Sequence, residues 1–228
     1  MKLSRILLLM VLLPVMGSII AAEQPAQDLT VKTDFQVGNL NPFVPPSVPD
    51  LFTGNEKFAY LIFPPDQGTC NEGGIQLETV SMLLEFDPTQ VPVTFAVQGG
   101  LLDAIWNPAM GRFEPGEEIC MGLPEIFEIV EPGLYTITVP VPDCSCVPWD
   151  DYYFLTLEYL DPFEALLPTD GLPEPGIVYN DKGTGWIDMF DLKKTAGGKI
   201  IVWGDVICCE PAVGNTTGTW GNVKSLYR

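Results

Sequence analysis

The amino-acid sequence predicts an all-β protein: a β-sandwich of the jelly-roll kind, stapled by disulfides and ending in a short helical tail. Short segments of alternating apolar and polar residues recur along the chain, and this period of two is typical of half-buried strands. The 22 Gly and 22 Pro residues are scattered between these segments, which favours many short strands joined by turns. Hydrophobic residues make up 46% of the chain and charged residues 18%. This composition excludes a disordered protein and suits two packed sheets.

The first 22 residues have the layout of a secretory signal peptide. Lys2 and Arg5 precede an apolar run over residues 6–15, and the small residues Ala21 and Ala22 follow it. The run is short for a membrane span, which needs roughly 20 apolar residues. We therefore expect cleavage after Ala21 or Ala22 and no membrane span afterwards. The mature protein would be secreted to the periplasm, the cell surface or the medium. A retained anchor helix is the alternative.

Residues 23–50 carry one strand signal and a stiff, proline-rich segment. Residues 29–37 alternate in one phase, and Pro42, Pro45 and Pro46 follow. A strand tethered in this way could complete the sheet of a neighbouring subunit by β-strand addition, which would make the protein part of an extracellular self-assembly. The alternative is an ordinary first strand of its own domain, because sequential strands usually pair locally.

The body of the protein, residues 51–212, holds the other strand signals. Residues 101–106 fit either a strand or a single helical turn, and the Pro- and Gly-rich residues 168–176 predict a long loop. The remaining alternating or apolar segments predict strands at residues 58–63, 75–86, 91–97, 126–130, 135–141, 153–159, 186–192 and 200–209.

Two local details refine this body. The apolar phase is odd at Ile75 and Leu77 and even from Val80 onward. Such a slip predicts a β-bulge or a strand break near residues 78–79. The turn sequence at residues 131–133 predicts a hairpin between the strands that flank it.

Residues 213–228 form a polar spacer and a tail. Trp220, Val223, Leu226 and Tyr227 recur at helical spacing, which predicts a short C-terminal helix. We expect either a docking or sorting tag or an ordinary chain end, since chain ends are often poorly ordered.

Six cysteines lie beyond the leader, and an even set in an exported chain indicates disulfides made in an oxidising compartment. The pair in the Cys144-Ser145-Cys146 segment also fits a redox or metal element. Cys208 and Cys209 are neighbours, and neighbours on a strand face opposite sides, so two separate partners are more natural than a bond between them. Of the many possible pairings, we expect Cys120 with Cys144, while Cys70 and Cys146 go to the Cys208-Cys209 doublet.

Charge and histidine content exclude several function classes. Without the leader the chain has nine basic and 30 acidic residues, a net charge of −21. Such a field repels nucleic acid and anionic lipid and permits divalent cations. The chain has no histidine, which excludes Ser-His-Asp and Cys-His catalysis and His-ligated zinc. A glycoside hydrolase built on two carboxylates stays open as an alternative.

Acidic loops suggest a calcium site. The candidate ligands are Asp150, Asp151, Asn180 and Asp181, because calcium takes carboxylate and carbonyl oxygens from such loops. Asp161, Asp188 and Asp191 lie near these residues in sequence. The spacing does not match an EF-hand, and turn-forming side chains are the alternative interpretation.

Aromatic residues suggest a ligand-binding face. Trp149, Trp186 and Tyr152 border predicted loops, where rings could stack on a sugar, whereas Trp203 lies inside an apolar strand and is expected in the core. Trp106 and Tyr153 are further candidates for this face, and the alternative is packing in the core, because aromatic residues in β-sandwiches are mainly core residues.

The PGLYTITV segment at residues 132–139 and the IIVWGDV strand at residues 200–206 resemble secreted bacterial jelly-roll modules, which include carbohydrate-binding modules and uncharacterised surface proteins. The resemblance implies binding or a structural role. We therefore expect a non-catalytic binding or surface-structural protein, with a glycan or a cell-surface molecule as its partner. The alternatives are the strand-addition assembly and the carboxylate glycosidase.

Overall fold

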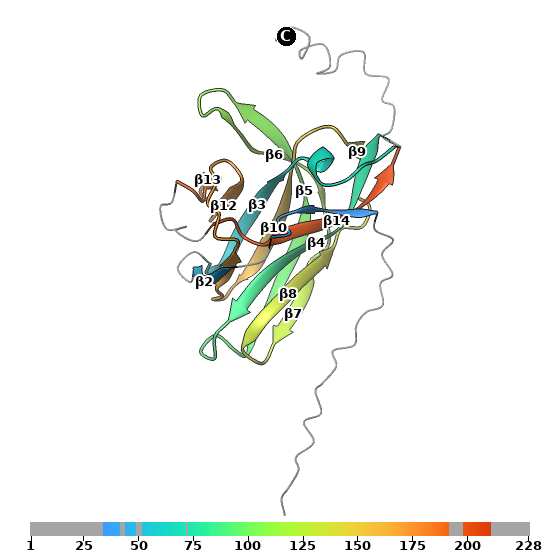
Figure 1. The fold of residues 1–228 in the computed structure, drawn as a ribbon. Coiled ribbons are helices and arrows are strands. Elements are labelled where there is room, and N and C mark those ends of the chain that lie inside the picture. Colours follow the sequence, from blue (N-terminus) through green and yellow to red (C-terminus); the bar gives the residue numbers. More distant parts are fainter. Residues whose placement is uncertain (1–33, 42–43, 49–51, 72, 192–197, 211–228) are drawn as a thin grey trace, which may run out of the picture. The chain divides into compact units, whose positions relative to one another are not determined.

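The computed structural model describes residues 34–41, 44–48, 52–71, 73–191 and 198–210 (Figure 1). The predicted signal peptide and the predicted helical tail lie outside these ranges. Two large antiparallel sheets and one small sheet make up the described chain, with a single 3-10 turn, η2 (Pro64–Asp66). Within the described ranges no helix has the length and apolar character that a membrane span requires.

The first large sheet has five strands in the order β1 (Phe35–Gly38), β14 (Val202–Cys209), β4 (Gly74–Phe86) and β8 (Gly133–Pro140), and the fifth, β9 (Val147–Pro148), also pairs with β4. The second has seven strands in the order β13 (Ile187–Asp188), β12 (Val178–Asp181), β3 (Gly54–Ile62), β10 (Tyr153–Pro162), β5 (Val93–Asn107) and β6 (Arg112–Met121), while β7 (Glu125–Ile129) also pairs with β5. The small sheet pairs β2 (Val44–Val48) with β11 (Leu167–Thr169).

The strand pairing is that of a jelly roll, as the sequence predicts. Four antiparallel pairs run β1 with β14, β3 with β10, β4 with β8, and β5 with β7. Along the chain these pairs are nested: the first strand pairs with the last one, and each following pair lies between the members of the pair before it. The chain therefore resembles one long antiparallel ribbon that is folded at its middle. The ribbon then wraps so that β14 meets β4 in one sheet and β10 meets β5 in the other, which gives the two Greek keys of the fold.

The hairpin predicted around residues 131–133 is wrong. The strand before this turn, β7, pairs with β5 in the seven-stranded sheet, whereas the strand after it, β8, pairs with β4 in the five-stranded sheet. The turn therefore crosses from one sheet to the other at the fold of the ribbon. Its Pro-Gly sequence reverses the chain direction equally well in both arrangements.

The slip in apolar phase on β4 is a β-bulge, as expected. Asp205 of β14 pairs with Thr79 and the next residue, Val206, pairs with Leu77, so Glu78 is the extra residue. Leu77 and Val80 are both buried. The bulge therefore keeps the apolar side of both halves of the strand toward the core.

Other predicted segments are extended or shortened. Residues 101–106 are the second half of β5, which settles the choice between strand and helical turn in favour of the strand. Of the strand predicted at residues 186–192, only Ile187–Asp188 is a strand within the described residues.

The N-terminal strand β1 pairs with β14 of its own chain, as an ordinary first strand would. The backbone N–H of Gly38 donates to Oε1 of Gln67 at 2.7 Å, and Nε2 of Gln67 donates to the carbonyl of Gly38 at 2.6 Å. The side chain of Gln67 therefore satisfies both backbone groups of Gly38, on the edge of β1 that faces away from β14.

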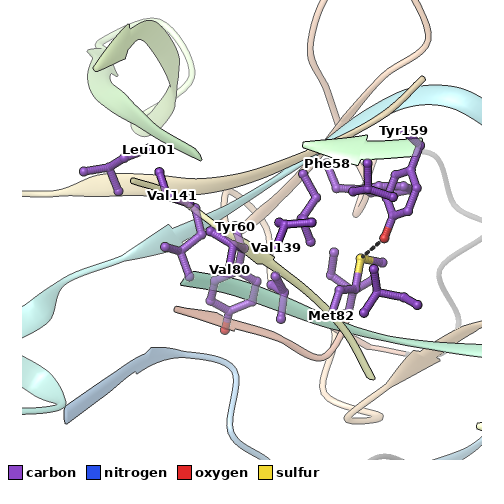
Figure 2. Packing of buried hydrophobic residues seen from close by; sticks show 14 of the residues in the cluster. Phe58, Tyr60, Val80, Met82, Leu101, Val139, Val141 and Tyr159 are labelled. Carbon is purple, nitrogen blue, oxygen red and sulfur yellow. Dashed lines mark hydrogen bonds between the residues drawn. The ribbon is translucent and has the colours of Figure 1, made fainter. Parts of the chain in front are cut away.

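The main core lies between the two sheets (Figure 2). Phe58, Val80, Met82 and Tyr159 are each at most 2% exposed, and each buried side chain of this size contributes about 1.5–3 kcal/mol. The hydroxyl of Tyr159 donates to the sulfur of Met82 at 3.3 Å (Figure 2), so its one polar group is satisfied inside the core.

A second apolar cluster covers part of the outer face of the seven-stranded sheet. Its buried members are Ala59, Leu102, Phe154 and Tyr179. The strand β10 therefore buries both faces near its start, since Leu155 belongs to the main core and Phe154 to this second cluster. Its partly buried neighbours come from β3, β5, β6 and the β12–β13 turn: Leu61, Ala104, Phe113 and Trp186.

Candidate functional site

Three disulfides gather loops at one rim of the sandwich. They join Cys70 to Cys208, Cys120 to Cys144, and Cys146 to Cys209, which confirms the expected pairing, and none of the six cysteines is free. The doublet that closes β14 thus holds the loop after η2 with one sulfur and the loop before β9 with the other. These bonds indicate an oxidising compartment, and they leave no thiol for redox or metal chemistry.

The aromatic residues predicted to bind ligand are used for packing. Tyr152 lies between two rings, with centroid distances of 4.5 Å to Phe63 and 4.4 Å to Phe113, so both of its faces are covered. Trp149 packs against the main core and Trp186 against the second cluster. Ring contacts cover both faces of Tyr152 only, while Trp149 and Trp186 are partly buried.

The four calcium candidates are not brought together. Asp181 pairs with Lys57 and Tyr153 with Ile62, five residues apart on β3, so the two pairs of candidates are separated by about 16 Å at the usual strand rise. The side-chain amide of Asn180 donates to Oε2 of Glu56 at 2.6 Å. The group formed by Asp150, Asp151, Asn180 and Asp181 is therefore spread over two places, and no group of three or more potential metal ligands occurs in the described ranges.

The nearby acids, Asp188 and Asp191, hold an arginine. Nη1 of Arg112 lies 2.6 Å from Oδ2 of Asp188, and Nη2 lies 2.8 Å from Oδ2 of Asp191. The hydrogen bond with Asp191 is the main cause that raises the pKa of Arg112. This clamp joins the start of β6 to β13 and the residues that follow it. Tyr179 adds a hydrogen bond from its hydroxyl to the carbonyl of Phe113 at 2.6 Å. Burial raises the pKa of Tyr179 to about 12, which keeps that donor protonated.

A second buried carboxylate, that of Asp170, connects the residues just after β1 with those just before β14. Asp170 accepts hydrogen bonds from the backbone N–H groups of Leu172 and Lys199, both at 2.9 Å, and from the amides of Asn39 and Asn41. Burial works to raise the pKa of Asp170, but these hydrogen bonds and the charge of Lys199 outweigh it and lower the pKa. The hollow beside Lys199 has a volume of about 10 Å³, room for no more than a water molecule.

The four cations of the described chain are all paired with acids. Lys57 lies 2.9 Å from Glu158, and Lys182 lies 3.4 Å from Glu56; Arg112 and Lys199 have the partners given above. The rest of the charge on the described surface is negative, which disfavours anionic ligands.

The outer face of the five-stranded sheet carries a different set of side chains. On β14, Val202 and Val206 are buried in the main core, so Trp203 and Asp205, which alternate with them, face outward. Trp203 is only partly buried, so its expected place in the core is wrong. No aromatic ring among the described residues stacks on it, in contrast to Tyr152.

Hydrogen-bonding groups surround Trp203 in two rows across the strands. In its own row, Trp203 pairs with Ser81, whose hydroxyl lies 2.8 Å from that of Thr138, while its neighbour on β1 is Gly38, which has no side chain. In the next row, Asp205 accepts from Nε2 of Gln36 at 2.8 Å and from the hydroxyl of Thr79 at 2.6 Å. The indole of Trp203 thus lies beside hydroxyl, amide and carboxylate groups that are held by hydrogen bonds. The term Trp203 face is used below for Trp203 together with these neighbours: Gln36, Thr79, Ser81, Thr138 and Asp205.

A sequence signal for the Trp203 face exists but is weak. The inward positions of β14 are Val202, Gly204 and Val206, and the glycine interrupts the apolar alternation. A Cβ atom on Gly204 would lie 2.7 Å from Cδ1 of Leu77, so the position is inward and needs glycine for close packing. If Gly204 is taken as an inward position, the alternation along β14 places Trp203 on the outer face of the sheet.

Comparisons of the chain with protein-family models, with curated proteins and with solved structures found no match.

Proposed function

We propose that the protein is a non-catalytic, exported binding domain that takes neutral glycan chains on the Trp203 face. The observation that carries this proposal is the partly open indole of Trp203 among hydrogen-bonded polar side chains of four neighbouring strands. An indole is amphipathic and offers a flat apolar surface for the C–H face of a sugar ring. The exposed hydroxyl of Thr138 and amide of Gln36, with the partly buried carboxylate of Asp205, supply the donors and acceptors that sugar hydroxyls need. The hydroxyls of Ser81 and Thr79 are themselves buried and hold Thr138 and Asp205 in place.

The charge of the protein supports an uncharged ligand. Each described cation is already paired, so an acidic polysaccharide would meet uncompensated negative charge. A neutral chain avoids this cost, and its hydroxyls donate well to Asp205. A set of polar groups spread over four strands suits a polymer that lies across several strands better than a small molecule that must be enclosed.

Export is supported by the three disulfides, which form and persist in oxidising compartments. The leader predicted at residues 1–22 agrees with this compartment. A glycan on a cell surface or in the medium is a partner that such a protein would meet.

The test is affinity electrophoresis through gels that contain neutral polysaccharides such as xylan, mixed-linkage glucan and mannan, followed by calorimetric titration with the matching oligosaccharides. Wild-type protein is expected to be retarded by at least one of these polymers. Trp203→Ala should weaken binding at least tenfold, because a buried aromatic contact at a binding centre contributes about 2 kcal/mol. Phe190→Ala, which removes an exposed ring (44%) from the β13 side, is the matched control and should bind like the wild type.

Three outcomes would contradict the proposal: no retardation by any neutral polysaccharide, equal retardation of wild type and Trp203→Ala, or release of new reducing ends during incubation. The last would show hydrolysis and favour the carboxylate glycosidase. Thermal unfolding of each variant separates a binding loss from a folding loss.

A further inference from the structure

The β5–β6 hairpin ends in an apolar tip, residues 105–110. Ile105 and Trp106 are each 52% exposed and Met110 is 53% exposed, and Pro108 and Ala109 between them are exposed too. Figure 1 shows this hairpin reaching away from the rest of the two sheets. Ile105 and Trp106 are neighbours on a strand and project from opposite faces of the hairpin, so apolar groups surround its end instead of forming one flat patch.

Three backbone N–H groups in the turn of the tip already have acceptors. Oδ1 of Asn107 accepts from the N–H groups of Ala109 at 3.0 Å and of Met110 at 3.2 Å, and its Nδ2 donates to Oε1 of Glu114 at 2.9 Å. The N–H of Gly111 donates to the carbonyl of Asn107 at 2.9 Å. These three donors keep their hydrogen bonds if the turn is buried in an apolar medium, which removes part of the usual cost of burying polar groups.

The tip is held rigidly at its base. Arg112 is clamped by Asp188 and Asp191, and the ring of Phe113 lies 4.4 Å from Tyr152 and 5.2 Å from Trp106. A braced hairpin loses little conformational freedom when its end is buried. The apolar end is therefore ready to insert without rearrangement.

Charge and size decide which partner fits the tip. Residues 104–111 contain no charged residue, although the whole chain carries a net charge of −19. A stable protein interface buries about 800 Å² on each partner, and a tip with three large apolar side chains does not supply that area. Insertion into the interfacial layer of a bilayer needs no matching surface, and tryptophan is enriched in that layer.

From these observations we propose that the β5–β6 tip inserts into the interface of a membrane with zwitterionic lipids, and that Ile105, Trp106 and Met110 are its anchors. The negative charge of the rest of the protein makes anionic lipid unfavourable. Attachment should therefore weaken, not strengthen, when anionic lipid is added at low salt. This contact does not depend on the Trp203 face, which belongs to the other sheet.

The test is flotation of the full-length exported protein with phosphatidylcholine vesicles. Wild-type protein should float with the vesicles, and the double variant Trp106→Ser/Met110→Ser should lose at least tenfold in partitioning, because it removes two of the three large apolar side chains of the tip. The double variant Ile126→Ser/Val130→Ser is the matched control, since it removes two exposed apolar residues (76% and 61%) outside the tip, and it should float like the wild type. Vesicles with 30 mol% phosphatidylserine should bind less protein at low salt than pure phosphatidylcholine vesicles do.

The proposal is overturned if wild-type protein does not float at millimolar lipid, if the tip and control variants float equally, or if anionic lipid increases binding. A second copy of the chain would be the partner instead if light scattering shows a wild-type dimer that becomes a monomer in Trp106→Ser/Met110→Ser while flotation is absent. Polysaccharide retardation of the same variants reports separately on the Trp203 face, so the two proposals fail independently.

Discussion

The strands of both sheets alternate inward and outward residues in the same way, but the outward residues of the two sheets differ in chemical type. On the seven-stranded sheet, the outward positions near the start of β10 hold large apolar groups such as Phe154 and Leu102, and the hairpin clamped by Arg112 covers them. On the five-stranded sheet, the outward positions hold hydroxyls, an amide, a carboxylate and Trp203. Among the described residues, apolar side chains cover the first face, whereas the second presents polar groups and a partly buried indole; the proposed function assigns ligand contact to this second face.

The largest effect should come from the covered face. Phe154→Ala is expected to lower the free energy of unfolding by about 3–5 kcal/mol, because the ring is fully buried and its removal leaves a cavity. Thr136→Ala on the other outer face, at an exposed position, should change it by no more than about 0.5 kcal/mol. Urea titration measures both, and similar values for the two variants would remove the distinction between the faces.

The clamp should be the next most sensitive point. Arg112→Ala leaves the fully buried carboxylate of Asp188 without its ion partner, which should cost about 3 kcal/mol of stability. Arg112→Lys keeps a charge but loses the fork that reaches both Asp188 and Asp191, so it should lie between the alanine variant and the wild type. Chemical denaturation of the three proteins measures the order of their stabilities. An exposed ion pair contributes no more than about 1 kcal/mol. If the alanine variant is less than about 1 kcal/mol less stable than the wild type, the clamp does not stabilise the outer face of the seven-stranded sheet.

The buried carboxylate of Asp170 should contribute to the acid dependence of stability. The folded protein lowers the pKa of Asp170 from its ordinary value of 3.8, so the folded state favours the charged form. The stabilisation is fully present above that ordinary value and is lost as the pH falls through the lower, folded value. Asp170→Asn should therefore be less stable than wild type at pH 7, by about 2 kcal/mol for the lost charged hydrogen bonds.

The difference between wild type and Asp170→Asn should shrink in denaturation curves recorded from pH 5 down to pH 2. Asp205→Asn, on the open face, is the comparison variant. A difference that stays constant across this pH range would contradict the assignment of the acid dependence to Asp170.

The smallest expected effect on ligand affinity comes from the hydrogen bond between Gln36 and Asp205 on the Trp203 face. Gln36→Ala removes one donor to Asp205 and should lower polysaccharide affinity about two- to fivefold, as expected for one exposed hydrogen bond. Calorimetric titration measures this change. A loss as large as that of Trp203→Ala would mean that the indole is not the main contact.

Much of the fold is readable from the sequence because strands have a local period. The bulge at Glu78 follows from a change of phase within a single segment, and the separate partners of Cys208 and Cys209 follow from the opposite faces of neighbouring residues on a strand. The crossing at residues 131–133 could not be read in this way, because a Pro-Gly turn has the same sequence whether the chain returns to the same sheet or moves to the other one. The cover over Phe154 comes from Phe113 and Trp186, distant segments that no local pattern connects.

The candidate site was missed for a related reason. Tyr152 and Trp186 border predicted loops, where exposure is the usual expectation, but tertiary contacts cover them. Trp203 lies in an apolar segment, where burial is the usual expectation, but Gly204 takes the inward place beside it. In both cases the outcome depends on which face of the sheet receives a covering layer.

The proposed function requires that the ligand binds to the Trp203 face and not to the outer face of the seven-stranded sheet. Hydroxyl-radical footprinting of the wild-type protein, with and without the neutral polysaccharide that retards it most, tests this claim in one measurement. Binding should protect Trp203 and its neighbours on β4 and β8 from oxidation while the labelling of Trp186 and Phe113 stays unchanged. Protection of Trp186 and Phe113 with Trp203 still labelled at its free rate would contradict the claim.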